Sequence, residues 1–535
     1  MSIMSSVSMK WSSVRPLALA ACLSAALALP TPANAQTITA VMQSGLRSLD
    51  PVINTDCMAR NHGYMIYDTL LATDANNQIQ PQMAEKWQVS ADGKTYTFTL
   101  RNGLRWHDGA PVKAEDCIAS IKRWAAQDKL GQIMMTLVAD MKVVDDNTFQ
   151  IALKEPTALV LSALAKLSGP PPFMMPKRTA ETPSTQPIKE HIGSGPFKFV
   201  ATEFKPGIKV VYEKNKDYVP RREPASWSAG GKVVHVDRVE WVIMPDQMTS
   251  VNALLNGEID YLERAPFDLL PMVEGRKDIK VGLIDKSGWQ AMYRFNHLHP
   301  PFDNKLIRQA AMYAVGQEDA LKAMVGNPKY YNTCPALFGC GMPYESSAGA
   351  DMIIPSNLEK ARQLLKEAKY DGTPVVILHP TDVSSVATHP VVIAQALRRA
   401  GFTVNLKAMD WGTLVANRAN QEPPAKGGWS IFATNNNIID IMDPLRNYTV
   451  AANGKKAWFG WPDVPKIEEL RYKFARTSNP AELKKLAEDI QKLVLDEGVV
   501  VPLGQYTFPA AYRTNLSGVI EAPVAFFWNI KKTGN

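Results

Sequence analysis

The first 35 residues constrain the fold most, because they predict that the rest of the chain folds outside the cytoplasm. Lys10 and Arg15 are the only charged residues there, and a largely apolar stretch of 13 residues follows from Leu17 to Leu29. The segment ends in the small-residue motif Ala33-Asn34-Ala35. A positive start, a short apolar run and an A-x-A motif, in this order, are typical of a cleavable secretory signal. We therefore expect cleavage after Ala35.

Two alternatives to this cleavage stay open. The apolar stretch could be a membrane anchor, although a helix needs about 20 apolar residues to span a bilayer. The run Leu19-Ala20-Ala21-Cys22 resembles a lipoprotein cleavage box, but Cys22 lies in the middle of the apolar stretch. No later segment approaches the length of a membrane span without interruption, so we expect a soluble mature chain.

The mature chain would comprise residues 36–535, which is 500 residues. This length exceeds what one hydrophobic core supports and predicts two or three lobes. The formal net charge changes only from +7 to +5 when the two positive residues of the signal are removed. Lysine and arginine are scattered, and no basic run is longer than a pair. The sequence therefore carries no footprint of nucleic-acid binding, and we expect no nucleic-acid partner.

Four cysteines remain after cleavage. Cys334 and Cys340 bracket the loop-forming sequence Pro-Ala-Leu-Phe-Gly. Because exported proteins meet an oxidising environment, this close pair predicts a local disulfide. A metal site would need further thiolates or histidines nearby, and none follows in the sequence. Cys57 and Cys117 could also pair, and the sequence alone leaves this open.

Strand and helix patterns alternate along the mature chain. Strands are predicted at residues 37–42, 96–100, 197–200, 209–212 and 239–244, the second of them in a hairpin that turns at Asp92-Gly93. Helices are predicted at 115–126, 248–255, 304–314, 356–368, 391–400 and 480–498, and around Tyr64 to Leu71. The stretch 165–187 is rich in Pro, Ser and Thr and is expected to form a loop. This mixture predicts α/β or α+β lobes.

Motifs of common enzyme classes are missing from the sequence. There is no Gly-x-Ser-x-Gly, no His-Glu-x-x-His and no phosphate-binding glycine loop. His297 and His299 form a His-x-His pair that could hold a metal from one strand face, but no third ligand is near. The favoured interpretation is a strand end that runs into Pro300-Pro301. No catalytic residue, metal or cofactor is therefore predicted.

Several motifs together resemble a known family. The run from Trp87 to Gly109, with Arg101-Asn-Gly-Leu-Arg-Trp106-His107-Asp108 inside it, is similar to a signature of family 5 extracellular solute-binding proteins. These proteins are the peptide/nickel-type binding subunits of ABC importers. Further matching segments follow in order along nearly the whole mature chain: Leu49-Asp50-Pro51, Ala114-Glu115-Asp116, Gly193-Ser194-Gly195-Pro196-Phe197, Asn256-Gly257-Glu258-Ile259-Asp260, Phe295-Asn296, Pro301-Phe302-Asp303 and Arg308-Gln309-Ala310.

The resemblance implies an α/β, two-lobed periplasmic binding protein fold of type II, similar to cluster C. The first lobe would carry an extra subdomain, and two crossing strands would form a hinge at 288–297 and 499–510. The expected limits are 1–35 for the signal, 37–76 with 195–287 and 505–535 for lobe I, 77–194 for the extra subdomain and 288–504 for lobe II. Ligand would be enclosed when the lobes close about the hinge.

The resemblance also implies a ligand site. In the family's peptide binders an aspartate in an Asp-x-x-Asp/Glu-Pro motif pairs with the ligand's ammonium group, and Asp440-Ile-Met-Asp443-Pro444 has this spacing. Asp440 is therefore the expected cation contact, with turn capping as the alternative. The tryptophan that often precedes this aspartate is replaced by Asn437, and Asn435 and Asn436 would offer amide groups. Trp411 is expected to line the cleft, with a place in the core as the alternative.

The function implied by this resemblance is binding. The chain would be the periplasmic, monomeric binding subunit of an ABC importer, and would deliver a small peptide or peptide-like, amine-bearing solute to an inner-membrane permease with ATPase subunits. One departure concerns the arginine that pairs with a dipeptide's carboxylate, because no arginine lies between Gly326 and Ser356. Another cargo (a metal chelate, an opine or an oligosaccharide) and an enzyme on the same scaffold remain alternatives.

Overall fold

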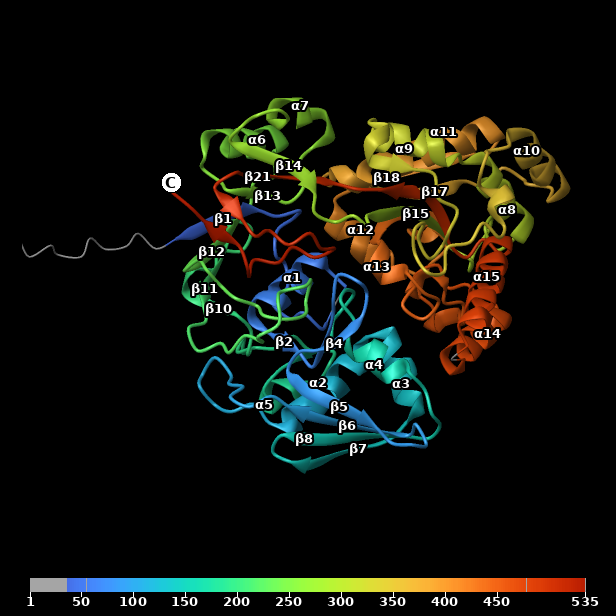
Figure 1. Cartoon of the computed structure of the whole chain (residues 1–535). Helices are drawn as coiled ribbons and strands as arrows, with labels where there is room; N and C mark the ends of the chain where they lie inside the picture. The colour runs from blue at the N-terminus through green and yellow to red at the C-terminus, as the bar shows by residue number, and fades with distance from the viewer. Residues whose placement is uncertain (1–35, 54, 478, 535) are drawn as a thin grey trace, which may run out of the picture. The chain divides into compact units, whose positions relative to one another are not determined.

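A seven-stranded sheet contains the N-terminal strand of the described chain (Figure 1). The computed structural model describes residues 36–53, 55–477 and 479–534, so the expected signal and Cys22 lie outside the described residues. The central strand β1 pairs in parallel with β12 and β13, because each is reached by a crossover, and the remaining pairs are antiparallel. In spatial order the strands are β10 (Phe197–Phe199), β11 (Lys209–Lys214), β12 (Arg238–Val242), β1 (Thr37–Val41), β13 (Tyr261–Leu262), β21 (Pro509–Arg513) and β14 (Ile279–Leu283).

A four-stranded antiparallel sheet follows the predicted hairpin. Its strands, in spatial order, are β5 (Ala84–Val89), β6 (Thr95–Leu100), β8 (Thr148–Leu153) and β7 (Val138–Asp145). Tyr96, Phe98 and Leu100 are buried on one face of β6, as the alternation in the sequence predicts. Helix α2 (Ala114–Gln127) packs on the sheet and buries Trp124. The predicted turn at Asp92-Gly93 is confirmed, since Gly93 has φ +70°.

A six-stranded sheet forms the other large part of the described structure. In spatial order its strands are β16 (Tyr331–Asn332), β20 (Val501–Tyr506), β15 (Trp289–Phe295), β19 (Ile431–Asn437), β17 (Val375–Pro380) and β18 (Val404–Met409). β15 is antiparallel to both of its neighbours, whereas β17 and β18 are parallel and are joined through helix α11 (Ser384–Ala400). Helix α11 packs against β17, β18 and β19 (Figure 1).

The chain passes twice between the seven-stranded and the six-stranded sheet. The first passage, residues 284–288, joins β14 to β15, and the second, residues 507–508, joins β20 to β21. The two passages meet at Gly288, which has φ +76° and where an added Cβ would lie 2.6 Å from the carbonyl oxygen of Tyr506. Only glycine therefore fits this contact without displacement of the backbone. The predicted limits of the lobes stay a prediction.

Helices and short strand pairs complete the described part of the fold. The remaining helices are α1 (Cys57–Ile66), α3 (Lys129–Leu137), α4 (Leu159–Leu164), α5 (Lys177–Ala180), α6 (Gln247–Asn256), α7 (Leu270–Val273), α8 (Lys305–Ala314), α9 (Gln317–Met324), α10 (Leu358–Glu367), α12 (Trp411–Asn417), α13 (Ile438–Ile441), α14 (Pro465–Arg476) and α15 (Pro480–Asp496). The short pairs are β2 (Asp68–Thr69) with β9 (Phe173–Met174), β3 (Leu71–Thr73) with β4 (Ile79–Pro81), and β22 (Leu516–Ser517) with β23 (Lys531–Lys532). No helix within the described ranges is both long and apolar enough to cross a membrane.

Local signals predicted several helix ends correctly and misplaced others. Gly257 and Gly401 end α6 and α11 in the left-handed conformation, as predicted. The helix expected to continue to Leu71 ends at Ile66, because the following residues enter short strands. Helix α10 is capped by Asn357, whose side chain accepts a hydrogen bond from Lys360 N, and not by the predicted Ser356. Helix α11 begins at Ser384, seven residues before the predicted start, and contains Pro390.

Candidate functional site

Asp440 lies where β19 ends and the short helix α13 begins. Its Oδ2 accepts a hydrogen bond of 3.0 Å from the hydroxyl of Ser168, a residue 272 positions earlier in the chain. Its Oδ1 is buried and has no hydrogen-bond partner in the described part of the chain. The carboxylate is therefore held by one oxygen, and the other oxygen remains able to accept a donor.

Positive groups from the N-terminal half of the chain surround this carboxylate. Arg60 on α1 donates to the Ser168 hydroxyl, so that Ser168 connects Arg60 to Asp440. Burial raises the pKa of Asp440, while Arg60, Lys166, the Ser168 hydrogen bond and Arg446 act to lower it. Lys166 is already engaged in an ion pair with Asp128. The net upward shift shows that these groups do not fully compensate the buried charge.

Cys57 stands at the start of α1, next to this cluster. Burial raises the pKa of its thiol to about 11, and the nearby charges of Arg60 and Asp440 act on it in opposite directions. Cys57 and Cys117 are not bridged in the structure; both are free thiols. Cys57 therefore contributes a neutral, partly apolar wall beside Asp440.

The three predicted asparagines alternate along the end of β19. Asn435 accepts a 2.6 Å hydrogen bond from Nε2 of His389 and donates to the carbonyl of Ser385. Asn436 accepts a 2.6 Å hydrogen bond from the hydroxyl of Tyr448. Asn437 caps α13 and donates to Asp285. The structure thus brings Asn436 towards the surroundings of Asp440 through Tyr448, whereas Asn435 faces α11 and Asn437 faces the first passage between the sheets.

Trp411 begins helix α12 on the other side of the six-stranded sheet from Asn435. Its backbone N–H donates to Asp382, and its half-buried ring lies 5.8 Å from the guanidinium of Arg418. An added Cβ at the next residue, Gly412, would lie 3.7 Å from Nη1 of Arg47. Because Arg47 follows strand β1, the start of α12 faces a segment that belongs to the seven-stranded sheet. Trp411 therefore lies at the boundary that we expect a ligand to occupy.

Sequence reasoning missed several residues of this site. Arg60, Ser168, Arg418 and Tyr448 belong to different elements, and only the fold brings them together. Ser168 lies in a stretch predicted only as loop. The sequence offers no local signal for Arg60 and Ser168, because they reach Asp440 from elements far away in the chain. Arg418, in contrast, caps the same helix that Trp411 begins.

The two histidines of the His-x-His pair each have a hydrogen-bond partner of their own. His297 hydrogen-bonds to the carbonyl of Gly498 at 3.1 Å, and His299 to the carbonyl of Gln421 at 2.7 Å. Burial lowers the pKa of His297 well below its ordinary value, and Arg308 and Arg294 contribute in the same direction. No group of three or more potential metal ligands occurs within the described ranges. Both imidazoles are thus bound to backbone carbonyls of the described chain.

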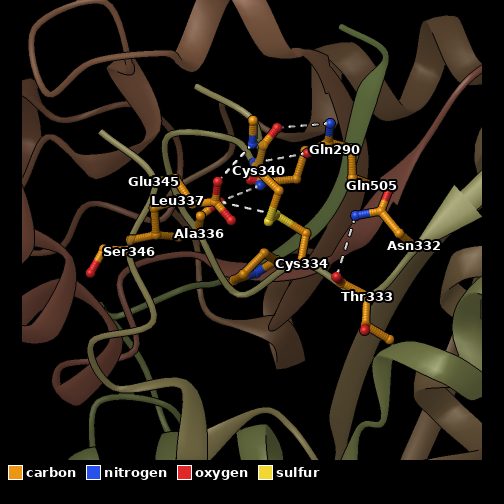
Figure 2. The surroundings of a disulfide bond; sticks show 12 residues. Gln290, Asn332, Thr333, Cys334, Ala336, Leu337, Cys340, Glu345, Ser346 and Gln505 are labelled. Carbon is orange, nitrogen blue, oxygen red and sulfur yellow. Dashed lines mark hydrogen bonds between the residues drawn. A yellow bond between two sulfur atoms is a disulfide. The ribbon is translucent and has the colours of Figure 1, made fainter. Parts of the chain in front are cut away.

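A disulfide joins Cys334 to Cys340 (Figure 2). The loop between them is bound to both strands that lead to the passages between the sheets. Gln290 on β15 donates to the carbonyl of Ala336 at 2.8 Å, and Gln505 on β20 accepts from the backbone N–H of Cys340 at 3.0 Å (Figure 2). The disulfide therefore stabilises a loop that holds β15 and β20 in place close to α13.

Comparisons with known proteins agree with this architecture. The chain is 42% identical over 517 residues to a probable peptide ABC transporter periplasmic-binding protein of Sinorhizobium fredii, covering 95% of this chain and 97% of that protein. A solved structure of the binding protein AgaA from A. tumefaciens R10, in complex with agropinic acid, superposes with a TM-score of 0.78 at 22% identity, covering 93% of this chain and 99% of that one.

A second solved structure has the same fold. The ABC transporter-associated periplasmic binding protein DppA of Helicobacter pylori, in complex with the peptide STSA, gives a TM-score of 0.77 at 21% identity, over 93% of this chain and 98% of that one. The predicted two-lobed fold of type II is confirmed by these likenesses. The model of bacterial extracellular solute-binding proteins, family 5, matches residues 78–458. The chain therefore belongs to the family 5 extracellular solute-binding proteins.

Proposed function

We propose that the chain is the periplasmic binding subunit of an ABC importer, and that it captures a peptide or peptide-like solute with a free amine. Membership of a solute-binding family and the name of the Sinorhizobium relative support this proposal. Its role would be binding rather than catalysis, and its partner would be an inner-membrane permease driven by ATPase subunits. The single observation that carries the choice of solute is the incompletely paired carboxylate of Asp440.

The geometry at Asp440 suits an ammonium group. The buried Oδ1 can accept a hydrogen bond, and a charge-assisted bond from an ammonium group is roughly twice as strong as a neutral one. Burial has raised the pKa of the carboxyl, which indicates a net deficit of positive charge around it. A bound cation would supply this charge. Cys57 and Tyr448 would form neighbouring walls, and Asn436 lies behind Tyr448.

An opine is the second candidate cargo. It is favoured by the absence of arginine between Gly326 and Ser356, where the family's dipeptide binders hold the ligand carboxylate, and by the likeness to a structure that contains agropinic acid. Opines and peptides both present nitrogen and carboxylate groups, so the two cargo classes are best separated by direct comparison. Mass spectrometry of the solute that co-purifies with the protein would identify its class.

The variant Asp440→Asn tests the amine contact. Three matched pools of tripeptides with uncharged, randomised side chains serve as probes: one with free ends, one acetylated at the amino end and one amidated at the carboxyl end. We expect the free pool to raise the melting temperature of the wild type by mass action, and the acetylated pool to have little effect. Asp440→Asn should weaken binding of the free pool by roughly 1.5–3 kcal/mol, measured by calorimetry.

Asp443→Asn is the control for this experiment. Asp443 lies in the same segment and also loses a charge; its Oδ1 accepts hydrogen bonds from the backbone of Leu445 and Arg446, and its Oδ2 pairs with the Arg446 side chain at 3.3 Å. An amide oxygen can keep these bonds, so affinity should stay unchanged. Equal binding of the free and acetylated pools to the wild type, or unchanged affinity in Asp440→Asn, would refute the amine contact.

A further inference from the structure

Arg418 lies just beyond the end of α12 and its guanidinium group is enclosed by aromatic rings. The distances from the guanidinium carbon to the ring centres are 5.8 Å for Trp411, 5.6 Å for Phe432, 5.5 Å for Trp458 and 4.9 Å for Phe459. Trp411 is the residue that we expect to line the cleft. The aromatic rings fix the position of the guanidinium, but they offer it no hydrogen-bond acceptor of full strength.

Arg418 differs from other arginines with buried side chains. Arg123 pairs with Asp50 at 2.7 Å, and Arg471 pairs with Glu468 at 2.9 Å. Arg294, close to Arg418 across the ring of Trp458, donates to three backbone carbonyls. Arg418, by contrast, has a buried Nε without a hydrogen-bond partner, and its side chain makes no ion pair with any described residue.

The electrostatic surroundings of Arg418 also lack a carboxylate partner for its charge. Burial lowers its pKa to about 10, and the only opposing influence comes from the phenol of Tyr448. The pKa of Tyr448 is in turn raised by Asp440 and lowered by Arg418. Tyr448 therefore lies within electrostatic reach of both charges. Its hydroxyl donates to the side-chain oxygen of Asn436 at 2.6 Å, which fixes the position of the ring.

A cavity of about 430 Å³ lies against Trp458, one of the four rings around Arg418. Tyr448 and Trp458 form part of its wall, and Lys129, Lys455 and Lys456 also line it. Its only carboxylate, Glu468, is already paired with Arg471. The volume suits a small solute or a portion of one, and the lysines attract anions.

We propose that Arg418 binds a carboxylate group of the same solute whose ammonium group Asp440 binds. A planar guanidinium can donate two parallel hydrogen bonds to a carboxylate, which would give Nε the acceptor that it lacks. The inference rests on the proposed function and specifies it: the solute is zwitterionic, with its two charges on either side of Tyr448. This position differs from the segment before α10, where the chain has no arginine.

The three tripeptide pools and agropinic acid test this contact on the purified full-length protein. Because the pools have uncharged side chains, the carboxyl end is their only anionic group. The wild type should bind the free pool about tenfold to a hundredfold more tightly than the amidated pool, as a charged hydrogen bond requires. Arg418→Gln should lose this discrimination and bind both pools with the low affinity of the amidated one. Agropinic acid tests whether Arg418 binds the carboxylate of an opine instead of that of a peptide.

Two further variants separate binding from folding. Arg418→Lys keeps the charge but not the planar fork, so it should restore part of the discrimination. Arg222→Gln, a change of the same kind at an exposed arginine remote in sequence, should leave all affinities unchanged. Melting temperatures without ligand show whether a variant is folded. If Arg418→Gln does not fold, the affinities of the wild type and of Arg418→Lys for the free and amidated pools test the contact instead. Weaker discrimination in Arg418→Lys would then support it, and equal discrimination would overturn it.

The outcomes distinguish this proposal from the proposed function. Equal binding of the free and amidated pools to the wild type, or retained discrimination in Arg418→Gln, would overturn the Arg418 contact while the amine contact stands. Equal binding of the free and acetylated pools would overturn the amine contact while Arg418 stands. Binding of agropinic acid alone, lost in Arg418→Gln, would support Arg418 and overturn the peptide proposal. A wild type that binds none of the probes would overturn both proposals.

Discussion

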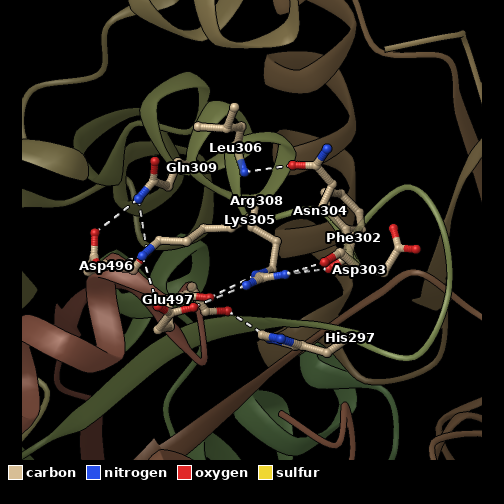
Figure 3. Close-up of polar contacts among 11 residues, drawn as sticks. His297, Phe302, Asp303, Asn304, Lys305, Leu306, Arg308, Gln309, Asp496 and Glu497 are labelled. Atoms are coloured by element: carbon tan, nitrogen blue, oxygen red, sulfur yellow. Dashed lines mark hydrogen bonds and ion pairs between the residues drawn. The ribbon is translucent and has the colours of Figure 1, made fainter. Parts of the chain in front are cut away.

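Two polar clusters of the molecule differ in how completely their charged groups are paired. Where α8 meets the end of α15, Lys305 pairs with Asp496 at 2.6 Å and with Glu497 at 2.8 Å, and Arg308 donates to the backbone carbonyls of Phe302 and Glu497 (Figure 3). Around Asp440, by contrast, a buried carboxylate oxygen has no partner within the described residues.

The difference indicates which cluster serves structure and which serves binding. Leaving a buried polar group unpaired costs about 1–3 kcal/mol, so a folded chain seldom does so without a function for the group. The α8–α15 cluster is complete without any ligand and therefore adds stability. The cluster around Asp440 leaves one carboxylate oxygen able to accept a further donor, which we propose that a ligand supplies. The following predictions test this contrast, in order of decreasing effect.

Arg308→Met should destabilise the protein most. The change removes a guanidinium that donates to the carbonyls of Phe302, Asp303 and Glu497, and leaves these acceptors half-buried without their donor. We expect the free energy of unfolding to fall by about 3 kcal/mol, measured by denaturant titration. Affinity for the free tripeptide pool should not change in the folded fraction. A variant with wild-type stability but weaker binding would contradict the contrast between the two clusters.

The disulfide loop is connected to the cluster around Asp440, so loss of the disulfide should lower both stability and affinity. Closing so short a loop contributes about 2 kcal/mol to stability, so the double variant Cys334→Ala, Cys340→Ala should lose this amount. Asn447, next to Tyr448, donates to the carbonyl of Leu337 in the loop. We therefore expect weaker binding of the free tripeptide pool as well. Reduced and alkylated wild-type protein serves as the control and should behave like the variant.

Asp440→Asn should have the smallest effect on stability, and of opposite sign. Burial raises the pKa of Asp440 above its ordinary value of 3.8, so between these two values the native state binds more protons than the unfolded state. The stability of the ligand-free protein therefore falls as the pH rises through this window. The asparagine variant has no carboxyl that must ionise in a buried place, so near neutral pH and without ligand it should be more stable than the wild type, by less than the two preceding effects.

Denaturant titrations of both proteins from about pH 4 to about pH 7 would check this prediction. The difference between the variant and the wild type should grow with pH and then level off above the raised pKa. Added free tripeptide pool should reverse the order at neutral pH, because only the wild type gains the charged contact. A variant that is less stable than the wild type without ligand would place Asp440 among the structural charges.

Local sequence signals predicted much of the fold. The alternation of Tyr96, Phe98 and Leu100 and the glycines after α6 and α11 act through neighbouring residues, and the structure confirms them. The end of α1 could not be predicted in this way. The residues after Ile66 enter β2, which pairs with β9 about a hundred positions later, and this tertiary pairing overrides the local helical pattern.

The candidate site was predictable only where a motif existed. The spacing of Asp440 and Asp443 singled out Asp440, and its role as a ligand contact remains a prediction. Ser168, which holds one oxygen of Asp440, has no such motif, because the contact depends on how a loop after α4 meets α13. The aromatic rings around Arg418 come from three separate segments of the chain. Only the fold of the six-stranded sheet brings these segments to the same guanidinium group.

The contact of the two passages at Gly288 has a mechanical consequence. Since 284–288 and 507–508 touch there, and since β15 and β20 are tied together beyond this point by the disulfide loop, sliding of one sheet past the other is blocked at the joint. We therefore expect the two sheets to move relative to each other by bending about Gly288 rather than by sliding. A pair of fluorescent labels, one on each sheet, would report solute occupancy as a change in a single distance, and the molecule would be a suitable frame for a sensor.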